Sequence, residues 1–205
     1  QNYSVSQVLG FSADQLKGRK VSAQQIVENA KKNGCQSISY TYVEPTVFYE
    51  FAYDCARLAQ ENNIKNVFVS NGYLSEQASR DISPYLDAIN IDVKSYNDDF
   101  YKKVCGARLK PVLDNVKLMK ELGVWVEVTT LVIPGLNDSD EELYSLASFL
   151  AAVDPQIPWH VSAFYPTYKM TDRFPTPSGT LARAAKIGRD SGLMFVYVGN
   201  SPGGG

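Results

Sequence analysis

Three polar residues alternate with apolar ones along one short stretch of the sequence. Asn90, Asp92 and Lys94 occupy every second position of residues 89–94. If this stretch is a strand, the three side chains share one face, because successive residues of a strand point to opposite sides. A carboxylate and an ammonium two residues apart can pair on that face. Polar side chains inside a sheet or barrel need such partners, because burying an unpaired charge is costly. The spacing alone leaves two interpretations open, a reactive pair at an active site or a buried ion pair that only tethers the strand.

Further candidates lie where other apolar runs end. Glu44 precedes Pro45, Ser70 and Asn71 end the next apolar run, and Thr129 lies within the long run 124–133. A glutamate at a helix start also simply favours the positive end of the helix dipole, and threonine is a common strand residue. Residue type and spacing therefore make these positions candidates without assigning them a role.

Short β-rich runs alternate with helical runs along the chain. We expect strands at 37–43, 67–70, 88–93, 124–133, 159–164 and 195–198, and helices at 22–33, 44–63, 75–82, 98–104, 111–122, 139–153 and 178–191. Strict alternation predicts an α/β fold of parallel strands joined by right-handed crossovers. A doubly wound sheet and a barrel both satisfy it, although no G-x-G-x-x-G follows a strand as a dinucleotide-binding fold would require. In a barrel, the chemistry lies at the carboxyl ends of the strands.

The bulk composition fits one domain. The chain has 205 residues, 44% of them hydrophobic, and a formal net charge of −2. The sequence shows no basic stripe for a nucleic acid, no apolar run of the about 20 residues that cross a membrane, and no secretion signal. We therefore expect neither a nucleic acid nor a membrane as partner.

The cysteines and the single histidine are expected to lie outside the chemistry. Cys35, Cys55 and Cys105 are odd in number and widely spaced, which predicts neither a disulfide framework nor a zinc site and favours a cytoplasmic location. His160 comes at the start of its expected strand. This places it at the bottom of a barrel, where we expect a structural role.

Taken in order, the motifs resemble the radical S-adenosylmethionine (SAM) superfamily. Within it they resemble the pyruvate-formate-lyase activating enzyme group, specifically the AmmeMemoRadiSam-system radical SAM proteins. The segments that carry the resemblance are 1–7, 40–46, 68–73, 90–94 with 98–106, 130–138 and 197–200. No single segment is specific, but they follow the family's order over nearly the whole chain.

The resemblance implies a partial (β/α)6-type TIM barrel of parallel strands, with the first strand and the cysteine loop missing from this chain. It also implies a [4Fe-4S] cluster, with its three cysteines expected upstream of Gln1. In the family, the reduced cluster cleaves SAM to methionine and a 5′-deoxyadenosyl radical, which abstracts a hydrogen atom from the substrate. The implied partners are SAM, an electron donor such as flavodoxin or ferredoxin, and a protein or small-molecule substrate. Activation of a glycyl radical enzyme is an expectation by analogy only.

By the same resemblance, Glu44 accepts hydrogen bonds from the SAM amino group. Asp92 and Lys94, the implied catalytic residues, act near the SAM ribose and carboxylate. The other residues implied to line this pocket are Tyr42, Ser70, Asn71 and Thr129.

Three departures from the family pattern qualify this interpretation. Tyr42 and Val43 replace the Gly-Gly before the family's glutamate, Ser70 replaces an aspartate, and the three cluster cysteines are absent. We expect residues 1–205 to be a single barrel core, truncated at the N-terminus and also at the C-terminus. Two alternatives stay open. One is a cluster-less barrel that binds SAM or a partner, and the other is an aldolase-type barrel in which Lys94 forms a Schiff base.

Overall fold

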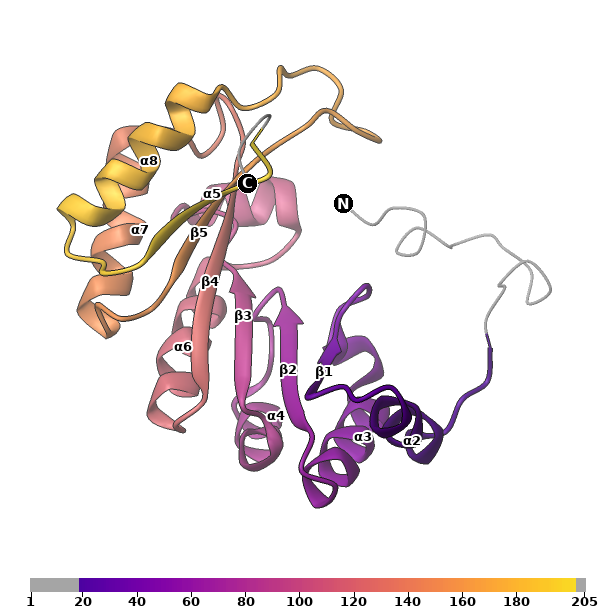
Figure 1. The fold of residues 1–205 in the computed structure, drawn as a ribbon. Coiled ribbons are helices and arrows are strands. Elements are labelled where there is room, and N and C mark those ends of the chain that lie inside the picture. Colours follow the sequence, from indigo (N-terminus) through magenta and orange to yellow (C-terminus); the bar gives the residue numbers. More distant parts are fainter. Residues whose placement is uncertain (1–18, 202–205) are drawn as a thin grey trace.

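The computed structural model describes residues 19–201, which form a curved six-stranded sheet with the long helices along its convex side (Figure 1). The strands are β1 (Ser37–Tyr40), β2 (Lys65–Ser70), β3 (Ala88–Asp92), β4 (Trp125–Val132), β5 (Trp159–Ala163) and β6 (Val196–Gly199). The longer helices are α2 (Ala23–Lys32), α3 (Tyr49–Glu61), α4 (Glu76–Ile82), α6 (Leu109–Glu121), α7 (Asp140–Val153) and α8 (Ser178–Asp190). Shorter turns are η2 (Pro45–Phe48), η3 (Ser83–Tyr85), α5 (Asp98–Phe100) and the π-helical η4 (Tyr101–Cys105).

The strands pair in sequence order, and every pairing is parallel. A doubly wound sheet reverses its strand order part-way, so this order identifies the partial-barrel alternative. Among the described residues β1 and β6 do not pair with each other, and the sheet stays open. The α/β partial barrel expected from the sequence is therefore confirmed.

Two expected helices are broken near the carboxyl edge of the sheet. The helix expected at 44–63 begins as the 3-10 turn η2, and α3 starts only after Phe48, whose backbone (φ −126°, ψ 39°) is not helical. The helix expected at 98–104 has one α-helical turn, α5, and then widens into the π-helical η4 before Gly106. Hydrophobic periodicity does not distinguish these tighter and wider turns from an α-helix.

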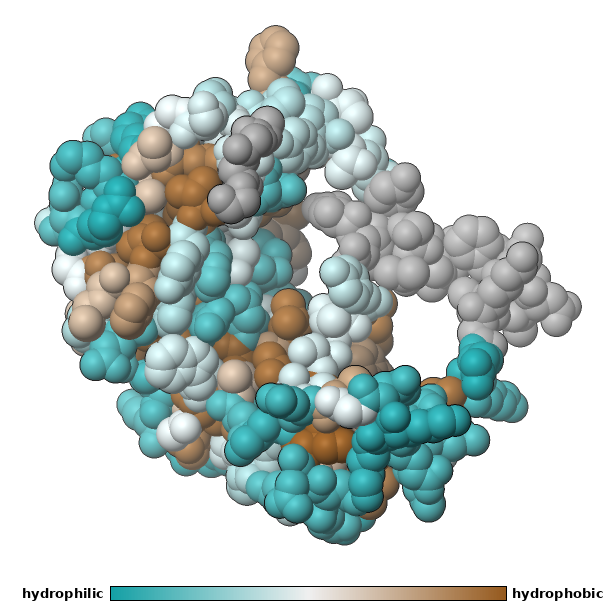
Figure 2. All heavy atoms as spheres, viewed as in Figure 1, coloured by the Kyte–Doolittle hydropathy of each residue, from teal (hydrophilic) through white to brown (hydrophobic). Residues whose placement is uncertain are grey.

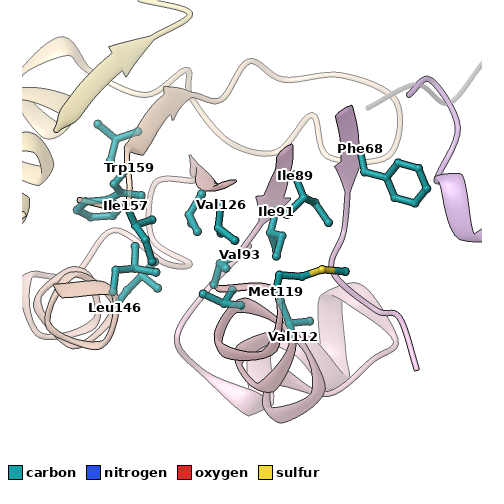
Figure 3. Close-up of a cluster of buried hydrophobic side chains, with 14 of the residues drawn as sticks. Phe68, Ile89, Ile91, Val93, Val112, Met119, Val126, Leu146, Ile157 and Trp159 are labelled. Atoms are coloured by element: carbon teal, nitrogen blue, oxygen red, sulfur yellow. The ribbon is translucent and has the colours of Figure 1, made fainter. Parts of the chain in front are cut away.

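The convex face of the sheet and the inner sides of the helices form the main core. Ile89, Ile91 and Val93 are fully buried and belong to one cluster with Val112 and Met119 of α6 (Figure 3). The alternation predicted for residues 89–94 is confirmed, since the polar residues between these three are only partly buried. In β3 the polar side chains thus point to the concave face. None of the helices in residues 19–201 is long and apolar enough to span a membrane.

Helix α8 packs closely against the last two strands at one glycine. A Cβ atom on Gly188 would lie 2.8 Å from Trp159 Cε3 and 3.0 Å from Val196 Cγ2. Gly179, in the first turn of the same helix, has no atom within 4 Å of an added Cβ. Alanine substitutions at Gly188 and Gly179 therefore separate the effect of close packing on stability from the effect of helix propensity.

We expect Gly188→Ala to lower the free energy of unfolding by about 1–3 kcal/mol, because the added methyl overpacks the core. Gly179→Ala is the control and should be neutral or stabilising by up to about 1 kcal/mol. Chemical denaturation of both variants measures the difference. Equal stabilities would contradict the close contact between α8 and β5.

Candidate functional site

A cavity of about 660 Å³ lies at the carboxyl ends of the strands. Its apolar walls include Phe100, Tyr101, Leu131, Ile133, Phe164 and Met170. Asn71 and Lys94, two of the residues expected from the sequence, contribute polar lining. The space-filling view shows hydrophobic and hydrophilic side chains mixed along the hollowed side of the molecule (Figure 2). A largely apolar cavity with a few polar groups is the usual form of a small-molecule site.

The carboxylate of Glu44 is fixed by groups from the neighbouring strand. Its Oε1 accepts a hydrogen bond from Ser70 Oγ at 2.7 Å, and its Oε2 accepts one from the backbone N–H of Asn71 at 2.7 Å. Oε1 also accepts a longer bond of 3.4 Å from the Thr46 N–H at the start of η2, so the glutamate caps that turn as well. Of the about four lone-pair sites of the carboxylate, these three bonds leave one, on Oε2, for a further donor.

The side chain of Tyr42, which the sequence placed among the pocket residues, lies outside the cavity and is exposed to solvent. Its side chain is 73% exposed and does not line the cavity. Its backbone has φ +55°, in the left-handed region that glycine adopts without strain. The tyrosine thus takes a backbone conformation suited to glycine, which is the residue type of the family pattern near this position.

Asp92 and Lys94 form an ion pair, with 2.5 Å between Oδ2 and Nζ. Their side chains are 32% and 37% exposed, so the pair is open to solvent rather than a fully buried tether. The backbone around Lys94 is held on both sides: its N–H donates to the Tyr101 hydroxyl (3.0 Å), and its carbonyl accepts from Asn137 Nδ2 (2.6 Å). Burial raises the pKa of Tyr101 above its ordinary value, which keeps it a neutral phenol. An ion-paired ammonium does not favour the Schiff-base alternative, which needs a neutral amine.

Thr129 and His160 lie in one row of the concave face. Thr129 is the register partner of both Asp92 and His160, and its hydroxyl donates to Asn90 Oδ1 at 2.9 Å. Thr129 does not line the cavity. His160 is the second residue of β5, as expected, but the register places it only two strand spacings, about 10 Å, from Asp92. The stagger of the strands thus brings His160 nearer to Asp92 than its place at the start of β5 suggests, although it does not line the cavity.

The histidine links three strands. His160 Nε2 lies 2.9 Å from Glu127 Oε2, and its ring stacks on Tyr197 with centroids 5.2 Å apart. The other oxygen of Glu127 accepts a hydrogen bond from Trp125 Nε1 at 3.2 Å. These contacts join β4, β5 and β6, in agreement with the expected structural role.

Residues 19–201 do not provide a metal centre. No group of three or more metal-ligating side chains is present among them. Cys35 precedes β1, Cys55 is buried in α3, and Cys105 ends η4, so the three thiols lie on separate elements and do not fit an iron–sulfur cluster. Residues 1–7, which carry the first part of the resemblance, lie outside the described residues.

Sequence reasoning missed the outer wall of the cavity. The π-helical η4 contributes Tyr101, Val104 and Cys105, and the segment after β5 contributes Phe164 and Met170. Segments far apart in the chain meet at this wall, so local sequence patterns do not indicate it. The exception is the positive φ of Gly106, because a glycine after a helix is the usual sign of that backbone conformation.

Comparison with known proteins identifies the family. The sequence profile of the Radical SAM superfamily matches residues 6–147. The chain belongs to the radical SAM superfamily. An uncharacterized protein of Methanocaldococcus jannaschii is 45% identical over 204 residues, which cover 99% of this chain and 60% of that protein. The pyruvate formate-lyase-activating enzyme of Clostridium pasteurianum is 29% identical over 49% of this chain and 42% of its own length.

Solved structures agree with this fold. A domain of a pyruvate-formate lyase-activating enzyme from Bacteroides vulgatus has a TM-score of 0.68 at 18% identity, and the match covers 80% of this chain and 98% of that domain. Streptococcus suis SuiB bound to S-adenosylmethionine has a TM-score of 0.71 at 16% identity, covering 90% of this radical SAM chain and 44% of SuiB. The chain spans 60% of the M. jannaschii relative and 42% of the C. pasteurianum enzyme.

The cysteines provide a test of the cavity wall. Burial raises the pKa of the Cys55 thiol to about 11, and partial desolvation raises that of Cys105, although the positive charge of Lys94 opposes the shift. We expect iodoacetamide to modify exposed Cys35 and Cys105 in the folded protein, and Cys55 only after unfolding. The rate at Cys105 should rise with pH through the alkaline range, because the thiolate is the nucleophile. Peptide mass spectrometry gives the three rates, and modification of Cys55 as fast as Cys105 would contradict this arrangement.

Proposed function

We propose that this chain is the core of a radical SAM enzyme that binds SAM at the carboxyl ends of its strands and uses it for hydrogen abstraction. The observation that carries the proposal is the pair of opposite charges at this edge. Glu44 follows β1 with its carboxylate fixed, and Lys94 follows β3 in the cavity lining. Asn71, whose N–H binds Glu44, lines the same cavity as Lys94 and so connects the two.

The charges match those of the amino-acid part of SAM. An ammonium is best bound by a carboxylate, which Glu44 supplies, and a carboxylate is best bound by a cation, which Lys94 supplies. Asp92 then remains for the ribose hydroxyls, and the apolar walls of the cavity suit the adenine ring. Asn71 adds a polar contact at the cavity edge.

In this superfamily a reduced [4Fe-4S] cluster and SAM together supply the radical that removes a hydrogen atom from the substrate. The cluster ligands are proposed to be cysteines that precede residue 1 in the full-length protein, with flavodoxin or ferredoxin as electron donor. The described residues bind the amino, carboxylate, ribose and adenine groups of SAM at one edge of the sheet, and η4 shields these groups from solvent.

Glu44→Gln removes the negative charge with little change in size. In the full-length protein, reconstituted anaerobically with iron and sulfide, we expect SAM to bind about 10- to 100-fold more weakly, because a hydrogen bond between charged groups is lost. Glu28→Gln, on the exposed side of α2, is the control and should bind SAM normally. Equilibrium binding of SAM and formation of 5′-deoxyadenosine measure the effect. An intact folded protein with neither a cluster nor SAM cleavage would overturn the proposed function.

As the finer proposal, the substrate is a glycyl residue of a partner protein. Its support is the similarity to activating enzymes, including the C. pasteurianum enzyme at 29% identity over 49% of the chain. We expect a glycine-centred radical signal in electron paramagnetic resonance when the reduced protein and SAM are mixed with the partner. A partner in which the candidate glycine is alanine is the control. SAM cleavage without any glycyl signal would leave the radical chemistry in place and reject this substrate.

A further inference from the structure

A chain of hydrogen bonds runs from two helices to the carboxylate of Glu44. Ser79 of α4 donates its hydroxyl to Asn115 Oδ1 at 2.8 Å, and Asn115 Nδ2 of α6 donates to the carbonyl of Gly72 at 3.0 Å. The N–H of Gly72 donates to Ser70 Oγ at 3.0 Å, and Ser70 Oγ donates in turn to Glu44 Oε1 at 2.7 Å. The turn after β2 therefore connects buried helix side chains to the candidate site.

The members of this chain are shielded from water. Ser79 is 0% exposed, Ser70 2% and Asn115 3%. A buried polar group that loses its hydrogen-bond partner is strongly unfavourable, so the bonds favour a single arrangement of the turn. The sequence offered no signal for this connection, because Asn115 lies 43 residues beyond Gly72 in an ordinary amphipathic helix.

Close packing restricts the same turn. Gly72 has φ +73°, and a Cβ atom there would lie 2.7 Å from Ile91 Cγ2 and 3.1 Å from Val112 Cγ1. The turn thus rests on β3 and α6 while Asn115 holds its carbonyl. A displacement of this turn moves both donors to Glu44, the Ser70 hydroxyl and the Asn71 N–H, together.

We propose that Asn115 and Ser79 are positioning residues that orient Glu44 for the ammonium group of SAM. The inference rests on the proposed function and names residues that do not themselves contact the ligand. A glutamate side chain has several rotatable bonds, and the hydrogen bonds to its two oxygens fix the direction in which the remaining lone pair of Oε2 points. Small displacements of a binding group weaken recognition strongly, so a buried support for the turn has a large effect on affinity.

The competing explanation is that Asn115 only stabilises the fold, and Asn66 provides a matched control for it. Asn66 lies in β2, four residues before Ser70, and is 0% exposed. Its side chain accepts from the Tyr40 hydroxyl and donates to the carbonyls of Ala56 and Tyr85. It therefore has the same residue type and burial as Asn115, but it bonds at the other end of the strand.

The experiment compares Asn115→Leu, Asn66→Leu and Ser79→Ala in the full-length protein loaded with its cluster. We expect all three to lower the denaturation midpoint, but only the substitutions at positions 115 and 79 to weaken SAM binding, by about 10-fold and about 3-fold. Ser79→Ala removes a single hydroxyl and keeps the test possible if Asn115→Leu does not fold. In the cluster-free protein, Asn71 amide exchange should accelerate in Asn115→Leu and not in Asn66→Leu.

A double-mutant cycle shows whether Asn115 acts through Glu44. We expect Asn115→Leu to have no further effect on SAM affinity when Glu44 is already alanine. If Glu44→Ala leaves SAM binding unchanged, the proposed SAM site is wrong. If Glu44→Ala weakens binding but Asn115→Leu matches Asn66→Leu, or if the effects of Glu44→Ala and Asn115→Leu simply add, the positioning proposal is overturned.

Discussion

The burial of one face of a parallel sheet under helices is the constraint on which the rest of this structure depends. Apolar side chains of the strands must point to the helices, so every intervening side chain points to the concave side. In β3 this rule buries Ile91 completely and leaves Asp92 one-third exposed. In β3, packing of the apolar neighbours thus directs the polar groups to the open face, whereas in β2 Asn66 and Ser70 lie on the buried face and are satisfied by hydrogen bonds.

The stagger of the strands then decides which polar groups meet. Each strand contributes residues to a row at a different point of its length, so the end of β3 is level in register with the beginning of β5. Asp92, Thr129 and His160 share one row for this reason. Position within a strand is thus a poor guide to distance from the active edge, and pairing register is a better one.

The sequence predicted the period-two pattern of residues 89–94 and the parallel strands, since these follow from the local pattern of residues and the alternation of elements. The start of the helix expected at 75–82 also agrees, because Ser75 caps α4 through the Ala78 N–H. The break at Phe48, the π-helical η4 and the bond from Asn115 to Gly72 were not predictable in the same way. They depend on contacts between distant segments, which local propensity does not contain. Two of the residues expected from the sequence, Asn71 and Lys94, line the cavity, whereas its walls and its support were not predicted.

The ion pair of Lys94 with Asp92 has a consequence for selectivity. Because the amine already has a partner and its backbone is held by Tyr101 and Asn137, an incoming carboxylate must compete with Asp92 for it. Binding is then an exchange of one anion for another, in which only the difference between the two interactions contributes to affinity. A sulfonium compound that has lost its carboxylate offers nothing for this exchange, and Lys94 stays with Asp92. On the proposed binding mode, an internal competitor of this kind narrows the difference in affinity between the ligand and an analogue without its carboxylate, because Lys94 never lacks a partner.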